Sequence, residues 1–507
     1  MINFFGHPMK SLMHKSRLLV SVCLALSCCA FLSNPADGAE YPLEIIQPRI
    51  GLDVTNRFYK AYPGLEFDVA ISVIGGRFPY EYRLVSGPVG MDIDASIGAL
   101  SWSVPSDFSG VVDVQVSVTD SQGQATTVQW PITITTNGFI FIDAINGRTV
   151  AQGGDGSIDN PWREINDWYL DKYNDSYAGQ FLYWRTGTYR TISAPRENDK
   201  RIAIAGGDKP LVWLAYPGDS PIIDTTGSHV SIYAGSSNVY FSGLEFRNFT
   251  KRHGVRISSS GSNVVFRKNK FFNLPAGAGG SGTNASALMI SDSSQGSYWS
   301  IIDNEFDGIH DKGYAILGYS TQKTLIARNR ITGIYVIGSK AIGPKTNNRN
   351  WFIRNNRIDI DAGDGVWIDT YPDTGDIEIS YNLIMVDSGH TLRVGQEDEH
   401  YGPITSLRNT YIGARILLQN LANDRGPVLF KNDVIINQLS NTNGIDNLED
   451  VSDGSRLIID NVLTGTESDG IVDASGRLTG EYAQFLGTRG FELASTQRPK
   501  APILQID

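Results

Sequence analysis

Apolar and polar residues alternate along four short segments in the first part of the chain. The segments are FDVAISVIG (67–75), ALSWSV (99–104), VDVQVSVTD (112–120) and TVQWPITI (127–134), and turns at glycine and proline lie between them. A period of two residues is that of a β-strand that buries one face. Several such strands within about a hundred residues are typical of a β-sandwich. We therefore predict an all-β sandwich over residues 41–136.

A much longer period begins after residue 138, where an asparagine shortly before an apolar residue recurs every 23 to 35 residues. Internal repeats of about 20–50 residues indicate a solenoid. The intervals favour a right-handed parallel β-helix over residues 138–480, with a C-terminal tail over 481–507. The recurring residues are Asn269, Asn304, Asn329, Asn356, Asn382, Asn409, Asn432 and Asn461.

These asparagines are expected to mark a buried turn in each coil. Asparagine tolerates left-handed backbone geometry, and its amide can hydrogen-bond to the same group one coil above and one coil below. A turn that repeats in register would thereby satisfy its polar groups from coil to coil.

The alternation within each coil also predicts which side chains point outward. In DGVWID (364–369) and HTLRVG (390–395), it sends Val366, Ile368, Leu392 and Val394 inward and the residues between them outward. Coils stack at about 4.8 Å, so outward residues in register form columns. The first column holds His253, Ser286, Tyr314, Lys340, Asp364 and His390; the second Arg256, Met289, Leu317, Gly343, Trp367 and Arg393; the third Ser258, Ser291, Tyr319, Lys345, Asp369 and Gly395.

The N-terminal segment predicts export. Three basic residues, the last of them Arg17, precede an apolar run over residues 18–32 that is too short for a membrane span. We predict a signal peptide over residues 1–38 and a secreted or periplasmic protein. A lipid anchor on Cys28 is not expected, because Leu26 lies one position too close for a good lipobox. All three cysteines lie in this segment, which excludes disulfide, thiolate-metal and cysteine-nucleophile chemistry in the processed chain.

The net charge limits the classes of molecule that the protein is expected to bind. The net charge of −11 becomes −13 without residues 1–38, because three basic residues and one acidic residue are lost. Such a surface repels nucleic acid, and a polyanionic substrate would need a local basic patch. No later run is apolar enough to span a bilayer. We expect a monomer whose partner is an acidic polysaccharide.

The later coils place charged and aromatic residues on one outward face. We interpret this face as a saccharide groove, because aromatic planes stack on sugar rings and charged groups bind carboxylates and hydroxyls. Cleavage of a uronate polymer by β-elimination needs a cation for the carboxylate, a base for the C5 proton and a proton donor for the leaving oxygen. We predict Lys345 as the base, Arg393 as the bidentate carboxylate ligand, and Tyr314 or His390 as the donor. The predicted substrate-binding residues are Lys340, Trp367, Asp364, Asp369 and Tyr319.

Three stretches carry resemblances. GMDIDASIGALSW (90–102) with VTDSQG (118–123) resembles the immunoglobulin-like modules of secreted bacterial proteins, which act as spacers or stabilising modules or bind carbohydrate weakly. GGDGSIDNPWREI (153–165) resembles the opening of many secreted parallel β-helices. AIGPKTNNRNWFIRNN (341–356) resembles the alginate lyase and chondroitinase B family, polysaccharide lyase family six, over about two coils.

The last resemblance implies a β-helical lyase with Lys345 as the base. The metal-binding glutamates of that family would fall near Gly338 and Lys340, and its arginine would fall at Trp367. We therefore expect Lys340 to replace the charge of calcium and Arg393 to act from the following coil. No metal or other cofactor is expected.

Two alternatives remain open. DGVWI and GHTLRVG resemble the aspartate and histidine motifs of polygalacturonases, which share this fold, and would make Asp364 and His390 the catalytic residues of a glycoside hydrolase. A non-catalytic glycan-binding β-helix is the other, and a dispersed basic and aromatic face would favour it.

Overall fold

The structure is a computed structural model, and it describes most of the chain from residue 41 to residue 465. The described ranges are 41–51, 55–164, 179–190, 201–204, 210–226, 229–232, 237–249, 253–257, 261–274, 284–290, 296–310, 312–369, 374–395, 402–419, 426–437, 445–446 and 457–465. The predicted signal peptide, the lipid-anchor position Cys28 and the predicted tail lie outside these ranges. Within them, no helix is long and apolar enough to cross a membrane.

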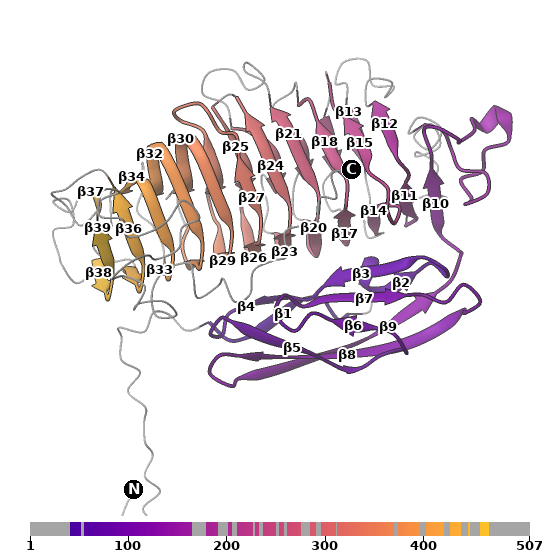
Figure 1. Ribbon diagram of the computed structural model, residues 1–507, viewed down its shortest axis with the longest axis horizontal. Helices are drawn as coiled ribbons and strands as arrows, with labels where there is room; N and C mark the ends of the chain where they lie inside the picture. The colour runs from indigo at the N-terminus through magenta and orange to yellow at the C-terminus, as the bar shows by residue number, and fades with distance from the viewer. Residues whose placement is uncertain are drawn as a thin grey trace, which may run out of the picture. The chain divides into compact units, whose positions relative to one another are not determined.

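The first part of the chain forms the predicted sandwich, whose strands are mostly antiparallel (Figure 1). Its strands alternate because one face of each packs on the core: in β9 every second residue, from Val128 to Ile134, is buried. A short 3-10 helix, η2 (Arg57–Tyr59), precedes β2. The described strands form three small sheets: β1 (Glu44–Gln47) with β4 (Ser72–Ile74); β2 (Lys60–Ala61), β9 (Ala125–Ile134), β8 (Gly110–Asp120) and β5 (Tyr80–Ser86); and β3 (Glu66–Ala70), β7 (Ala99–Ser103) and β6 (Asp92–Ile93).

The second part is a parallel β-solenoid, so the predicted all-β fold of a sandwich followed by a β-helix is confirmed (Figure 1). The short helix η3 (Val150–Gln152) lies between its first two strands. One of its sheets, here called the first sheet, has one strand per coil. Within the described residues its twelve strands are β10 (Phe139–Ile142), β11 (Phe181–Trp184), β14 (Leu211–Ala215), β17 (Val239–Ser242), β20 (Val264–Arg267), β23 (Gly296–Ile302), β26 (Thr321–Ala327), β29 (Arg349–Arg354), β31 (Ile377–Ser380), β33 (Ile404–Leu407), β35 (Val428–Lys431) and β38 (Leu457–Asp460).

The other sheet, here called the second sheet, often has two short strands per coil, which merge into one long strand in β30 and β32. Within the described residues its strands are β12 (Gly187–Arg190), β13 (Arg201–Ile204), β15 (Pro221–Asp224), β16 (His229–Ile232), β18 (Glu245–Arg247), β19 (His253–Ile257), β21 (Lys270–Leu274), β22 (Ala285–Ile290), β24 (Glu305–Ile309), β25 (Gly313–Gly318), β27 (Arg330–Thr332), β28 (Lys340–Pro344), β30 (Arg357–Ile368), β32 (Leu383–Val394), β34 (Thr410–Leu418), β36 (Val434–Asn437), β37 (Ile445–Asp446) and β39 (Leu463–Gly465).

The solenoid core is a stack of equivalent positions from successive coils, because parallel coils repeat in register. Phe271 lies flat against Phe306 of the next coil, with ring centroids 4.6 Å apart and planes at 4°. Trp213 and Phe241 stack in the same way at 4.8 Å and 2°. The residues predicted to point inward, Val366, Ile368, Leu392 and Val394, are fully buried in this core.

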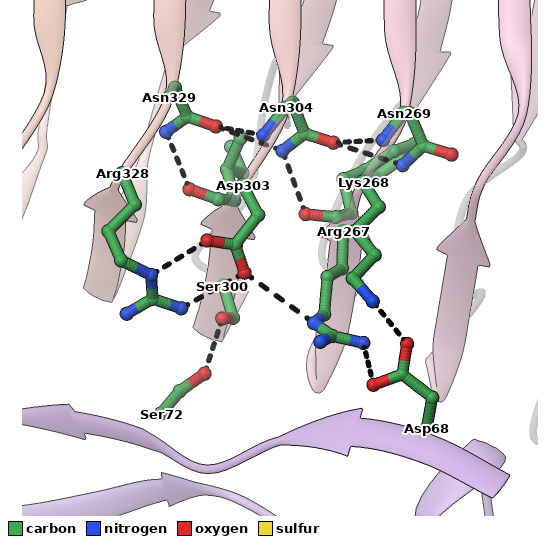
Figure 2. Close-up of polar contacts among 12 residues, drawn as sticks. Asp68, Ser72, Arg267, Lys268, Asn269, Ser300, Asp303, Asn304, Arg328 and Asn329 are labelled. Atoms are coloured by element: carbon green, nitrogen blue, oxygen red, sulfur yellow. Dashed lines mark hydrogen bonds and ion pairs between the residues drawn. The ribbon is translucent and has the colours of Figure 1, made fainter. Parts of the chain in front are cut away.

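The predicted asparagine ladder is present at the turn between the first and second sheets (Figure 2). The Nδ2 group of Asn304 donates to Oδ1 of Asn329 at 3.0 Å and to the backbone oxygen of Phe266 at 2.9 Å. The Oδ1 atom of Asn304 in turn accepts from both the backbone N and Nδ2 of Asn269. The same pattern continues through Asn356, Asn382 and Asn409.

Two details of the prediction are wrong. The left-handed residue of each turn is the one before the ladder asparagine, for example Arg328 at φ 57° and Tyr381 at φ 56°. Asn432 and Asn461 occupy this left-handed position and not the ladder, which passes from Asn409 to Asp433. The misassignment arose because asparagine suits both positions, so residue type alone did not fix the register.

Sandwich residues pack on the outer side of the first sheet. Apolar and aromatic side chains from its early coils, among them Phe141, Tyr183, Leu214 and Tyr240, share one buried cluster with the sandwich core. The Phe58 ring, for example, lies edge-on to Tyr240 at 6.0 Å. Because outward positions of a sheet are usually polar, an aromatic outer face needs a cover.

Ion pairs extend this contact (Figure 2). Asp68 of the sandwich forms ion pairs with Arg267, at 2.8 Å, and with Lys268, while Ser72 and Ser300 are hydrogen-bonded at 2.6 Å. Arg267 is 2% exposed and also lies 3.5 Å from Asp303. Burial acts to raise the pKa of Asp303, but Arg328 and Arg267 outweigh it and hold that pKa below its usual value.

Candidate functional site

The strand register brings the predicted site residues together on the second sheet. Tyr314 of β25 pairs with Lys340 of β28, Lys340 with Asp364 of β30, and Asp364 with His390 of β32. Backbone pairing also places Trp367 beside Arg393. The first two columns are therefore as predicted, since parallel strands one coil apart keep their outward residues aligned.

The third column is aligned for its described members, while Ser258 and Ser291 lie outside the described residues. Lys345 donates its backbone N–H to Gly318, and Asp369 donates to Pro344, which continues the ladder beyond the ends of the strands. The Lys345 ammonium lies 3.1 Å from Oδ2 of Asp369, whose side chain is only 2% exposed. Lys345 is thus held in an ion pair.

Three cations surround the indole ring of Trp367, and we call Lys340, Lys345 and Arg393 the cationic cluster. The Lys340 ammonium is 4.5 Å from the ring centroid, the Arg393 guanidinium carbon 5.1 Å and the Lys345 ammonium 5.7 Å. A cation near the face of an aromatic ring is attracted by its quadrupole, most strongly with tryptophan. The indole therefore stabilises positive charges that would otherwise repel one another.

A glycine makes room for this arrangement. The Tyr314 ring stacks on Trp367 at 6.2 Å and 12°, although their strands are two coils apart. Gly343 lies on the strand between them, and a Cβ atom there would approach Cε1 of Tyr314 to 2.3 Å. The position of Gly343 in the second column thus allows the two rings to meet above the intervening strand.

The structure corrects the predicted use of the aromatic residues. Trp367 is 5% and Tyr314 1% exposed, so neither ring presents a face to a sugar. Burial raises the pKa of the Tyr314 hydroxyl well above its usual value. Tyr319 is half-buried, and its hydroxyl accepts a hydrogen bond from Asn284. These aromatic side chains form the floor of the site.

Asp364 and His390 form a closely held pair. Nδ1 of His390 lies 2.7 Å from Oδ1 of Asp364, and Arg393 approaches the other carboxylate oxygen at 4.0 Å. An ionised carboxylate only accepts, so the imidazole donates from Nδ1, and its Nε2 atom is buried. Within the described residues, His390 Nε2 has no hydrogen-bond partner.

The positive groups of the site are more accessible than the negative ones. The side chains of Asp364 and Asp369 are 5% and 2% exposed, whereas those of Lys345 and Arg393 are 18% and 24% exposed. The carboxylates lie beneath the cations and pair with them. A ligand approaching this face would meet ammonium and guanidinium groups first.

Lys340 has a reduced proton affinity. Burial lowers the pKa of Lys340 to about 8, and the neighbouring charges of Arg393 and Lys345 act in the same direction, against Asp364 and Asp369. A lysine with such a pKa is neutral in a substantial fraction of molecules at mildly alkaline pH, and it can then accept a proton.

Two residues beside the site, Gln419 and Arg415, were not predicted from the sequence. Oε1 of Gln419 accepts from NH2 and Nε of Arg393 at 3.1 and 3.3 Å, which fixes the guanidinium group. Arg415, in the next coil, is the backbone pairing partner of His390. Both residues continue the first and third columns into the next coil, but the register shifts at His390 and they are four residues apart instead of five. The spacing of the earlier coils would therefore not have found both.

No group of three or more histidine, cysteine, aspartate or glutamate side chains within the described residues is arranged to hold a metal ion. The cationic cluster and the Asp364–His390 pair are the chemical groups that the site offers.

Comparison with known proteins bears on the sandwich. Residues 53–137 match the family model described as "Putative Ig domain", and this part of the chain is an Ig-like domain. The match does not extend into the solenoid, so the resemblance to polysaccharide lyase family six stays a prediction. No curated protein matches the chain.

Among solved structures, the catalytic domain of a GH87 alpha-1,3-glucanase in complex with nigerose is 11% identical, with a TM-score of 0.24 over 80% of this chain and 83% of that one. A putative alpha-galactosidase from Bacteroides fragilis is 12% identical, with a TM-score of 0.17 over 45% of this chain and 46% of that one. The chain thus spans about half the length of the latter. At these TM-scores, neither likeness carries an argument about this chain.

Proposed function

We propose that the second sheet of the solenoid binds an acidic polysaccharide at the cationic cluster and cleaves it by β-elimination. The observation that carries this proposal is the layering of the site, with Lys340, Lys345 and Arg393 around Trp367 and both carboxylates buried beneath them. A polymer of uronate sugars is the polysaccharide whose charge complements such a face.

Elimination uses the groups that are accessible. Arg393, held by Gln419, and Lys345 would neutralise the substrate carboxylate, which makes the C5 proton more acidic. Lys340 would take that proton, because its pKa of about 8 lies near the working range of a general base. The electron pair left at C5 forms the new C4–C5 double bond as the C4–O bond breaks, and water would protonate the leaving oxygen, because Nε2 of His390 is buried.

This proposal moves the role of base from Lys345, as the sequence predicted, to Lys340. The reason is that Lys345 lies in a 3.1 Å ion pair with Asp369, while Lys340 is the lysine whose pKa is lowered by burial. Lys345 then serves as a fixed positive charge for the carboxylate.

Hydrolysis is the less fitting chemistry. An inverting hydrolase needs two carboxyl groups that face the scissile bond with space for a water between them. Asp364 and Asp369 lie on different columns, are almost fully buried, and are each paired with a basic side chain. They are better suited to orient His390 and Lys345 than to attack a sugar.

The test is an assay of the processed protein on alginate, pectate, dermatan and other uronate polymers, following the ultraviolet absorbance of an unsaturated product together with new reducing ends. We expect both signals to rise in parallel. Reducing ends without absorbance would replace elimination by hydrolysis, and retention of polymer without either signal would indicate a glycan-binding protein.

A further inference from the structure

One exposed aromatic side chain lies in the segment that leads into the candidate site. Among the described phenylalanine, tyrosine and tryptophan residues of the solenoid, Tyr335 is the most exposed, at 54%. Ile337, two residues further on, is 68% exposed. Both belong to the segment between β27 and β28, immediately before Lys340. An exposed apolar pair beside a charged site is a common sign of a ligand contact.

The Tyr335 ring is held in place. It stacks on the imidazole of His310 with ring centroids 5.1 Å apart and planes at 13°. The imidazole covers one face of the phenol ring, so the exposed part of Tyr335 lies away from His310. A rigid ring loses little conformational freedom when a ligand packs on it, which is why aromatic side chains are efficient contact residues.

The segment that carries Tyr335 is tied to the site at both ends. Ile334 is fully buried, and its carbonyl accepts from the backbone N–H groups of Asp361 and Ala362. Ser339 is also fully buried, and its carbonyl accepts from the N–H of Asp364 at 2.8 Å. The segment that carries Tyr335 therefore has a fixed backbone position relative to Asp364 of the site.

A cation lies beside the same segment. Gly338 has a φ of 93°, and a Cβ atom there would lie 3.8 Å from the aliphatic carbons of Lys312, whose side chain is exposed. An aromatic ring on a segment that also packs on a lysine suits a sugar ring that carries a carboxylate: the C–H face of the sugar packs on the phenol, and the carboxylate pairs with a cation.

We propose that Tyr335, stacked on His310 and flanked by Lys312, is a binding subsite for a uronate ring one or more residues away from the bond that is cleaved. The inference rests on the proposed function of the cationic cluster and deepens it. It assigns to Tyr335 the stacking role that the sequence analysis gave to the buried Trp367. Tyr335 touches the substrate but none of the reacting atoms, so it contributes to affinity and not to the chemical step.

The test compares Tyr335→Ala with wild type on whichever uronate polymer wild type cleaves, using initial rates of product absorbance. We expect the KM of Tyr335→Ala to rise about tenfold with kcat nearly unchanged, as for the loss of one stacking contact. Tyr335→Phe keeps the ring and should behave like wild type. Phe108→Ala, which removes a 38% exposed aromatic side chain from the sandwich, is the matched control and should also leave KM unchanged.

Two outcomes separate this inference from the proposed function. If wild type is active and Tyr335→Ala has the KM of wild type, the subsite is refuted while elimination stands. If wild type cleaves no polymer, the proposed function fails, and retardation in gels that contain alginate or pectate decides the subsite. Weaker retardation of Tyr335→Ala than of wild type and Phe108→Ala would support it; equal or absent retardation would refute it.

Discussion

Two lysines at opposite ends of β28 illustrate how the neighbours of a side chain decide its chemistry. Lys340 and Lys345 are five residues apart and both lie within 6 Å of the Trp367 ring centroid. Asp369 pairs directly with Lys345, whereas Lys340 lies in a partly buried position next to two other cations. The environment of Lys340 favours a neutral amine at moderately alkaline pH.

Lys340→Ala should therefore reduce kcat by at least about 100-fold on a polymer that wild type cleaves, because a positioned general base contributes at least that much. In wild type, kcat/KM should rise with pH and level off above about 8, since the base must lose its proton and its pKa is about 8. Initial rates measured across this pH range provide the check.

Lys345→Ala is the comparison variant. It should raise KM and lower kcat less than Lys340→Ala does, and its pH profile should keep a rising limb shifted to higher pH, because the charge of Lys345 helps to lower the pKa of Lys340. Loss of all turnover in Lys345→Ala, with substantial turnover in Lys340→Ala, would return the role of base to Lys345 as first predicted from the sequence.

At the scale of a structural element, the asparagine ladder is the repeated unit that closes the turns. Each ladder asparagine donates from Nδ2 to the ladder residue of the next coil. It also donates to the backbone carbonyl three residues before the ladder residue of the previous coil. Asn382, for example, donates to Asn409 and to the carbonyl of Ile353. The ladder ends at Asp433, which accepts from Asn409 at Oδ1, while its other oxygen has no hydrogen-bond partner within the described residues.

Burial raises the pKa of Asp433 to about 7, with hydrogen bonds from Asn409 opposing it. The unfolded chain ionises this carboxyl near its usual pKa of 3.8, and the folded protein only near 7. The folded state therefore binds the extra proton between these values, so the stability contributed by Asp433 falls as pH rises from about 4 to about 7 and is lost above that.

Asp433→Asn should stabilise the protein by about 1–3 kcal/mol at pH 8 and by little near pH 4, because asparagine cannot ionise and its Nδ2 can donate to the Ser406 carbonyl by the ladder rule. Chemical denaturation at the two pH values measures this. Asn382→Asp, in the middle of the ladder, is the mirror variant and should destabilise at neutral pH. A gain from Asp433→Asn that is equal at both pH values would contradict the titration argument.

At the scale of the whole molecule, the contact between the sandwich and the first sheet bears on the role of the Ig-like domain. The sequence left open a spacer, a stabilising module or a weak carbohydrate-binding module. Aromatic side chains of the early coils are buried in one cluster with the sandwich core, and Arg354 of a later coil pairs with Glu378 at 2.7 Å and donates to Tyr80 of the sandwich. These contacts favour the stabilising role.

Arg267→Ala should lower the free energy of unfolding by about 1.5–3 kcal/mol, because it removes a buried partner of Asp68 and Asp303, while Lys268 and Arg328 still pair with these carboxylates. Arg330→Ala is the matched control: its pair with Glu305 is also an arginine–carboxylate pair of the solenoid, but Arg330 is 58% exposed, so the loss should be below about 1 kcal/mol. Equal losses in the two variants, measured by denaturant unfolding, would show that the interface pair carries no special weight.

The repeating features of this protein were determined by the sequence alone. Strand alternation, the 23- to 35-residue period and the three outward columns follow from local periodicity, and a parallel stack converts equal spacing into spatial neighbours. Residue type was less informative where one type suits two positions, which is why Asn432 and Asn461 were placed in the ladder.

Only the tertiary structure decided which side chains are buried and which are paired. Outward direction on a strand did not mean exposure: Gly343 lets Tyr314 lean over the next coil onto Trp367, and three cations close above the indole. The pairing of Asp369 with Lys345, of Asp364 with His390 and of the sandwich with the first sheet depends on side-chain conformations and on contacts between distant parts of the chain. These are set by packing in three dimensions, and no period along one chain encodes them.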